Sequence, residues 1–273
     1  MQVKRCGVVG AGVMGGGIAQ VLALGGCEVV LYDIDQEACS RALARIEHDR
    51  YGLKRAVEIG KVSSSDAEGA LARLSTTTDR AVVCDDADLI IEAVPENFAT
   101  KIETFKWIDK LAPIRAILAT NSSGFPVAPI AAATERPDRV IVWHWASPAP
   151  VMPLAEIVVH PLASPTTIDT IVALARKCGK NPEVIRDQPL AWGYVSSRVF
   201  FAMVREAHRV VSESIASREQ VDAIMRDCFR WPSGPFEMMT RTSTGWGGAP
   251  QRGEAAKLMA NMGMPLDSPS PPS

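Results

Sequence analysis

The chain has 273 residues, of which 47% are hydrophobic and 22% charged, and its formal net charge is −2. This length predicts two domains, and this composition supports a sizeable buried core. The small negative charge excludes the basic field that nucleic acids attract, and no apolar run reaches the ~18 residues of a membrane-spanning helix. We therefore expect neither a nucleic acid nor a membrane as a partner.

The cysteines indicate a reducing compartment. They are widely spaced, with neither Cys-x-x-Cys pairs nor histidines nearby, and the glycine-rich start does not match a signal-peptide core. The six are Cys6, Cys27, Cys39, Cys84, Cys178 and Cys228. This pattern predicts reduced, mostly buried thiols, a cytoplasmic location and no metal site.

The N-terminal region predicts a βαβ dinucleotide-binding unit. An apolar strand over residues 6–9 leads into the sequence GAGVMG and a helical stretch that ends near Leu24. A second apolar strand over residues 28–32 ends on Asp33, which lies 18 residues after Gly15. Strand, glycine turn, helix and acid at this spacing are typical of a Rossmann-type nucleotide site.

Each position of this unit has a chemical reason. Gly10 permits the tight turn, Gly12 lets the backbone approach a pyrophosphate at the positive end of the helix, and Gly15 allows close packing of helix on sheet. The carboxylate of Asp33 accepts ribose hydroxyls but repels a 2′-phosphate, so the predicted cofactor is NAD rather than NADP. The predicted cofactor-binding residues of the unit are Gly10, Gly12, Val13, Met14, Gly15 and Asp33.

Strands and helices then alternate. Further strands are expected at residues 89–93, 116–120, 140–143 and 156–159. Helical character is expected over residues 36–73 with an interruption at 60–63, and again at 100–111 and 166–178. This alternation predicts an α/β fold with a doubly wound, mostly parallel Rossmann-type sheet.

From about residue 190 the pattern is helical only. Helices are expected at residues 195–214 and 217–228, with a weaker one at 253–262, and the Pro- and Ser-rich tail from about 265 is expected to be disordered. We therefore predict an NAD-binding Rossmann domain over residues 1–188 and a smaller all-helical domain over residues 189–273.

A candidate acid–base pair lies between two expected strands. His144 follows the strand at 140–143, and Glu156 starts the next strand 12 residues later. Removing a proton from an alcohol during hydride transfer requires a base near neutral pH, and a carboxylate behind a histidine fixes its tautomer. Taken alone, a histidine between Trp143 and Trp145 is more typical of a packed core residue.

Several motifs together resemble the 3-hydroxyacyl-CoA dehydrogenase family, in the order that the family has them. They are GAGVMGGGIAQ (residues 10–20), EAVPE (92–96), NSS (121–123), HWASPAPVMPLAE (144–156), GYV (193–195) and GPF (234–236). The sequence VVHP at 158–161 also resembles the lambda-crystallin and carnitine dehydrogenase branch of the superfamily. The resemblance covers residues 3 to about 239.

The resemblance implies roles for particular residues. It makes His144 the catalytic base, Glu156 its partner, and Ser123 a hydroxyl donor to the substrate oxygen. It also places Glu96 and Lys101 near the nicotinamide, although from the residues alone we would expect a helix-start carboxylate and a surface lysine.

Three features depart from the family pattern. Ser197 stands where the family has the asparagine that helps to hold the substrate, so Ser197 is the candidate substrate-binding residue there. Ser147 also replaces a family asparagine, and the sequence after Glu237 lacks the glycine- and aromatic-rich ending of the family.

The function that the resemblance implies is NAD-dependent interconversion of 3-hydroxyacyl-CoA and 3-oxoacyl-CoA by a homodimer joined through its helical domain. Two alternatives stay open. One is a dehydrogenase of a small free hydroxy acid or of a hydroxyacyl group on a carrier protein, and the other is a non-catalytic NAD-binding protein.

Overall fold

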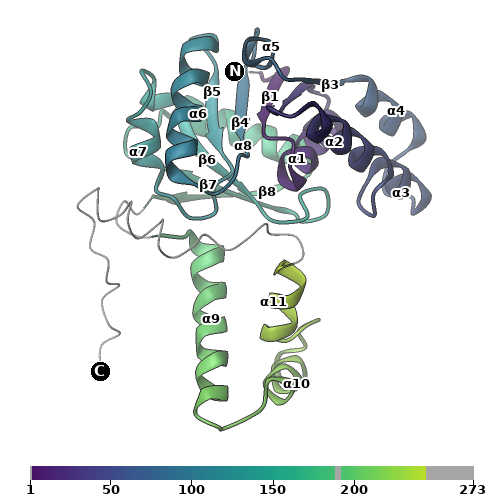
Figure 1. Cartoon of the computed structure of the whole chain (residues 1–273), viewed down its shortest axis with the longest axis vertical. Helices are drawn as coiled ribbons and strands as arrows, with labels where there is room; N and C mark the ends of the chain where they lie inside the picture. The colour runs from purple at the N-terminus through teal and green to yellow at the C-terminus, as the bar shows by residue number, and fades with distance from the viewer. Residues whose placement is uncertain (1, 188–191, 244–273) are drawn as a thin grey trace.

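A computed structural model describes residues 2–187 and 192–243 of the chain. Figure 1 shows a sheet flanked by helices, with a smaller group of helices below it. The strands are β1 (Arg5–Val9), β2 (Glu28–Tyr32), β3 (Leu74–Thr77), β4 (Leu89–Glu92), β5 (Ile117–Thr120), β6 (Val140–Trp145), β7 (Leu154–Val159) and β8 (Asn181–Arg186). The helices of this part are α1 (Val13–Leu24), α2 (Gln36–His48), α3 (Leu53–Glu58), α4 (Ser64–Ala72), α5 (Arg80–Cys84), α6 (Phe98–Leu111), α7 (Val127–Ala131) and α8 (Pro165–Lys177).

The strands form one doubly wound sheet in the order β3-β2-β1-β4-β5-β6-β7-β8. All neighbours are parallel except β6 and β7, which are antiparallel. The chain continues from β1 to one side and returns to the other side at β4, so the switch point lies between these two strands. Ligands of such sheets bind outside the carboxyl ends of the strands at this point.

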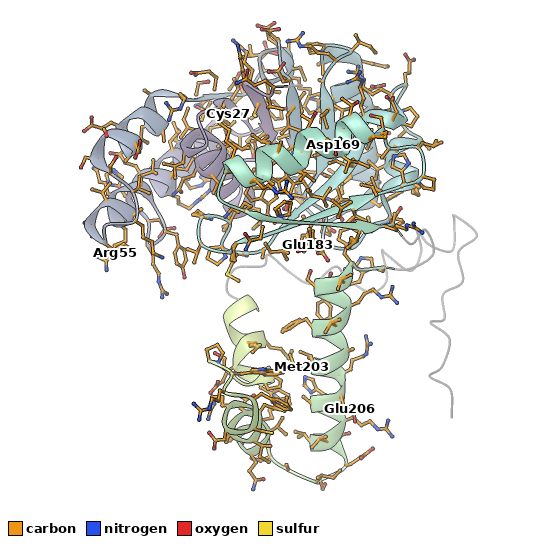
Figure 2. The ribbon with its side chains drawn as sticks, turned by 180° about the vertical axis from the view of Figure 1, so that it is seen from behind. Cys27, Arg55, Asp169, Glu183, Met203 and Glu206 are labelled. Atoms are coloured by element: carbon orange, nitrogen blue, oxygen red, sulfur yellow. The ribbon has the colours of Figure 1, made fainter. Side chains whose placement is uncertain are left out.

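The central strands are buried because helices cover both faces of the sheet. Every residue of β4, β5 and β6 is buried, as expected for parallel strands between two helical layers. Side chains from α1, α2, α4 and α8 share one apolar cluster, and side chains from α5, α6 and α7 share the other. The back view in Figure 2 shows α8, labelled by Asp169, lying across its face of the sheet.

The expected sheet is confirmed, with one correction that affects the site. His144 lies inside β6 rather than after it, because antiparallel pairing with β7 extends the ladder to Trp145 opposite Ala155. The sequence did not predict β3 or β8. Both are edge strands, and neither contains a fully buried residue.

Several helical elements differ from the prediction. The expected helix over residues 36–59 is two helices, since α2 ends at His48 and α3 begins at Leu53. Gly52 lies in the turn between them, where a Cβ would stand 2.8 Å from the carbonyl oxygen of Arg45. The expected start near Ser63 is confirmed, because the Ser63 hydroxyl accepts a hydrogen bond from the Asp66 N–H. The sequence did not predict α5 or α7.

The helical part contains α9 (Val195–Ser212), α10 (Arg218–Phe229) and α11 (Pro235–Ser243). Figure 1 shows α10 and α11 beside the longer α9, and their small core includes Ala207, Val221 and Phe236. The sequence did not predict α11, and the helix expected at 253–262 and the tail from 265 lie outside the described residues. Among the described helices, none has the length and hydropathy required to span a membrane.

Candidate functional site

The glycine-rich turn after β1 has the shape that a dinucleotide requires. Gly10 has φ of +106°, which side chains other than glycine rarely adopt. A Cβ on Gly15 would stand 1.7 Å from the carbonyl oxygen of Gly10, whereas a Cβ on Gly12 would meet no atom within 4 Å. Gly10 and Gly15 are therefore required by the turn itself, and Gly12 borders open space that a pyrophosphate can fill.

The start of α1 supplies hydrogen-bond donors to that space. Gly12 is the N-cap and no side chain caps the helix, so the first-turn N–H groups, among them those of Val13 and Met14, have no acceptor within the helix. The first turn carries no acidic side chain, and the side chain of Val13 is exposed. These features fit an anionic cofactor at the positive end of the helix.

Asp33 stands at the carboxyl end of β2, beside the same turn. Its Oδ2 accepts a hydrogen bond from the Ala11 N–H at 2.8 Å, and its Oδ1 accepts one from the Asp35 N–H at 3.2 Å. A carboxylate has about four acceptor positions, so positions remain for ribose hydroxyls. The turn, the helix start and this acid together fit NAD.

His144 and Glu156 form a buried pair across the antiparallel strands β6 and β7. They are directly opposite in register, and Nδ1 of His144 donates to Oε2 of Glu156 at 2.8 Å. Because Nδ1 carries the hydrogen in this bond, Nε2 is the basic nitrogen of the neutral ring. Nε2 has no hydrogen-bond partner among the described residues. The pair therefore presents a free basic nitrogen.

Ser196, at the start of α9, completes the environment of Glu156. Its hydroxyl donates to Oε2 at 2.7 Å and its N–H to Oε1 at 3.1 Å. Burial raises the pKa of Glu156, but the hydrogen bonds from His144 and Ser196 outweigh burial and lower this pKa below its usual value. Glu156 is therefore ionised at neutral pH and places a negative charge beside the His144 ring.

Ser123 lies in the turn after β5, at the same edge of the sheet. Its N–H donates to Oε1 of Glu96 at 3.1 Å, and its hydroxyl makes no hydrogen bond to any described residue. The hydroxyl of the preceding Ser122 donates to Oε1 of Glu96 at 2.5 Å. Of these two hydroxyls, only that of Ser123 is free to form a hydrogen bond with a substrate.

A buried ionic network supports Glu96. Lys101 on α6 is only 1% exposed, and its Nζ pairs with Glu92 at 2.8 Å and with Glu96 at 3.1 Å. Burial lowers the pKa of Lys101, but the two carboxylates outweigh this effect and raise it. Glu92 also accepts a hydrogen bond from the Thr120 hydroxyl at 2.6 Å. The expectation of a surface lysine from the residues alone is wrong.

The first turn of α9 is attached to the Ser123 turn. The Ser197 hydroxyl donates its single hydrogen to the carbonyl oxygen of Ser123 at 2.8 Å and accepts one from the Tyr194 N–H at 3.3 Å. The Gly193 N–H donates to the carbonyl oxygen of Gly124 at 2.9 Å. In this arrangement Ser197 holds the Ser123 backbone, and it can meet a substrate only as an acceptor.

The structure thus brings the predicted residues into two neighbouring groups. Gly10, Gly12, Val13, Met14, Gly15 and Asp33 surround the turn after β1. His144, Glu156, Ser123, Ser197, Glu96 and Lys101 lie around the ends of β4 to β7 and the start of α9. The sequence did not predict Glu92, Thr120, Ser122 or Ser196 as site residues. Glu92 could have been recognised, because it is a charged residue at the end of the apolar run of β4. Among the described residues no cluster of His, Cys, Asp and Glu could hold a metal ion.

Comparison with known proteins identifies the family. The family model "3-hydroxyacyl-CoA dehydrogenase, NAD binding domain" matches residues 5–188, and the model of the C-terminal domain matches residues 193–266. The chain belongs to the 3-hydroxyacyl-CoA dehydrogenase family. This confirms the resemblance read from the motifs, and with it the NAD cofactor and an oxidoreductase that acts on a CH–OH group.

Individual members of the family match over most of this chain. It is 39% identical to a probable 3-hydroxybutyryl-CoA dehydrogenase of Bacillus subtilis over 87% of this chain and 80% of that protein. The crystal structure of the (S)-3-hydroxybutyryl-CoA dehydrogenase PaaH1 from Ralstonia eutropha is 35% identical, with a TM-score of 0.80 over 86% of this chain and 80% of that one. The 3-hydroxybutyryl-CoA dehydrogenase structure from Escherichia coli is 36% identical, with a TM-score of 0.81, over 87% of this chain and 49% of that longer chain.

Proposed function

We propose that this protein interconverts 3-hydroxyacyl-CoA and 3-oxoacyl-CoA with NAD as hydride acceptor and NADH as hydride donor, and that His144 is its base. The observation that carries the proposal is the buried His144–Glu156 pair, with Nε2 free and the Ser123 hydroxyl uncommitted. Family membership supports the thioester substrate, since the B. subtilis, R. eutropha and E. coli relatives are named for 3-hydroxybutyryl-CoA.

The residues divide the proton chemistry between them. In the oxidation, Nε2 of His144 takes the proton of the 3-hydroxyl group while the C3 hydrogen leaves with its electron pair as hydride. Glu156 stabilises the imidazolium that forms, and in the reduction this imidazolium returns the proton to the 3-oxo oxygen. The Ser123 hydroxyl donates to the same oxygen as negative charge develops on it.

The cofactor is held by the first group of residues. Gly12, Val13 and Met14 offer backbone N–H groups to the pyrophosphate, Asp33 accepts from the ribose, and Gly10 and Gly15 shape the turn. Glu96 and Lys101 are proposed to border the nicotinamide, with the Lys101 ammonium fixing the Glu96 carboxylate. When bound, the nicotinamide supplies the site that accepts or donates the hydride.

Steady-state reduction of acetoacetyl-CoA by NADH tests the proposal. His144→Ala should lower kcat about a hundredfold or more, the scale of general-base catalysis, while NADH binding is retained. Turnover of free 3-oxo acids or carrier-bound acyl groups but not of acetoacetyl-CoA would assign the first alternative function. NADH binding without turnover of any of them would assign the non-catalytic one.

We also propose two domains, a cytoplasmic location and a homodimer. The division at 188/189 is supported by the separate family matches to residues 5–188 and 193–266. The cytoplasm is supported by the free cysteines, most of which are buried. The homodimer is supported by large apolar side chains exposed on α9 and α10, among them Val195, Val199, Ile224 and Phe229. A native mass of twice the chain mass is expected by light scattering.

A further inference from the structure

One buried charge has no part in the chemistry described so far. Lys180 lies between α8 and β8, elements labelled by Asp169 and Glu183 in Figure 2, and is 6% exposed. Its Nζ donates to the carbonyl oxygen of Ala149 at 2.6 Å and to that of Met152 at 2.8 Å. No carboxylate among the described residues pairs with it. The ammonium is held by backbone carbonyls of a single loop.

That loop, residues 146–153, joins the strand of His144 to the strand of Glu156. It packs on the cofactor-binding helix α1, since the Cβ position of Gly17 lies 3.2 Å from both Ala149 Cβ and Pro150 Cδ. The contact is close, because even the methyl group of an alanine at position 17 would require the loop to shift by a few tenths of an ångström.

Lys180 also reaches the residue next to His144. Its Nζ stands 5.6 Å from the centroid of the Trp145 ring, and its neighbour Asn181 donates an N–H to the carbonyl oxygen of Pro153 at 2.7 Å. Both ends of the segment that joins His144 to Glu156 therefore contact residues 180 and 181.

Burying an ammonium without a counter-ion is costly, and burial lowers the pKa of Lys180. An apolar side chain would fill this position at a smaller cost, so packing alone does not account for a lysine here. A lysine ammonium has three N–H donors at the end of a long side chain, so it can donate to both loop carbonyls at once.

We propose that Lys180 is a positioning residue for the reaction, and that its ammonium holds the 146–153 loop against α1 so that the His144–Glu156 pair keeps its place relative to the nicotinamide. This inference rests on the proposed function. It predicts that loss of the donors lowers the rate of the chemical step, because small misplacements of reacting groups cost up to about a hundredfold.

The test compares Lys180→Met, whose unbranched side chain is one atom shorter and has no donors, with Lys180→Arg, which has both donors and charge. Lys177→Met, at an exposed position at the end of α8, is the matched control. With acetoacetyl-CoA and NADH, Lys180→Met should lower kcat about tenfold or more and leave the Kd for NADH within about twofold. Lys180→Arg should recover most of kcat, and the control should match the wild type.

A second readout does not depend on turnover. The low-field proton NMR signal of Nδ1–H in the His144–Glu156 hydrogen bond should weaken or shift in Lys180→Met and persist in the control. If Lys180→Met does not fold, Lys180→Gln replaces it. Its amide nitrogen lies one bond closer to the backbone than Nζ and carries no charge, so it should not hold both loop carbonyls, and kcat should fall in a chain with native circular dichroism.

The proposal is overturned if a folded Lys180→Met or Lys180→Gln protein retains both kcat and the Nδ1–H signal. It is also overturned if kcat falls only in proportion to the folded fraction. A wild-type protein that does not reduce acetoacetyl-CoA would instead refute the proposed function, and the NMR signal would still decide whether Lys180 orders the pair.

Discussion

Replacing Glu156 by glutamine is the sharpest perturbation of the proposed catalytic pair, because it changes one oxygen to an NH2 group and keeps the shape of the side chain. Oε2 accepts from both Nδ1 of His144 at 2.8 Å and the Ser196 hydroxyl at 2.7 Å. An NH2 group at this position can only donate. The imidazole must then accept at Nδ1 and carry its hydrogen on Nε2, which is the wrong tautomer for a base.

The magnitude follows from the bond between Oε2 and Nδ1 of His144, because this bond strengthens as the imidazolium forms. A hydrogen bond between charged groups contributes about 1.5–3 kcal/mol. At 1.36 kcal/mol per tenfold change, its loss should lower kcat about 10- to 150-fold, and the tautomer change adds to this loss.

The assay is steady-state oxidation of NADH by acetoacetyl-CoA, with NADH affinity measured separately by fluorescence. Glu183→Gln is the control, because Glu183 is the exposed register partner of Glu156 on β8. We expect the control to retain wild-type kcat and both variants to bind NADH normally. A kcat for Glu156→Gln within about threefold of the wild type would refute the role of this carboxylate.

Three further predictions concern the cofactor and acid stability. Asp33→Ala should narrow the difference in affinity between NAD(H) and NADP(H), and equal binding of both by the wild type would refute the cofactor assignment. Gly12→Ala should fold with a wild-type Tm but lose NADH affinity, whereas Gly15→Ala should lower the Tm, since its methyl group would stand 1.7 Å from a carbonyl oxygen. Burial raises the pKa of Glu156, but hydrogen bonds from His144 and from the start of α9 lower it below the ordinary 4.5. The resulting stability is present above about pH 4.5 and is lost as the pH falls through the lowered value. The Tm difference between wild type and Glu156→Gln should shrink in that acid range, and a constant difference would contradict this reasoning.

The fold was predictable wherever a strand is a continuous apolar run. The runs at β4, β5 and β6 are buried on both faces, so their composition alone indicates central strands. In contrast, β8 begins Asn181-Pro182 and contains only exposed and half-buried residues, and β3 contains one large apolar side chain. Pairing to a neighbouring strand, rather than local composition, makes these two segments strands.

Contacts of the site were predictable where the two residues lie close together in the sequence. The pair His144 and Glu156 is separated by one loop, whereas Ser196 reaches Glu156 from 40 residues away and no local pattern indicates this contact. Lys101 was recognisable as an inward-facing residue, because the buried positions of α6 include Phe98, Lys101 and Phe105 at helical spacing. A lysine at such a position requires buried partners, and the two preceding carboxylates, Glu96 and Glu92, were the candidates.

The chemistry of the site depends on both parts of the chain. Residues 193–197 donate hydrogen bonds to three consecutive carbonyl oxygens. The Ser197 hydroxyl donates to that of Ser123, the Gly193 N–H to that of Gly124, and the Tyr194 hydroxyl to that of Phe125. Ser196 in the same segment supplies two of the three hydrogen bonds to Glu156. One turn at the start of α9 therefore holds both the Ser123 turn of the proposed donor and the carboxylate behind the proposed base, His144. A displacement of α9 relative to the sheet would disturb the two together, so substitutions in this turn should affect kcat more than cofactor affinity.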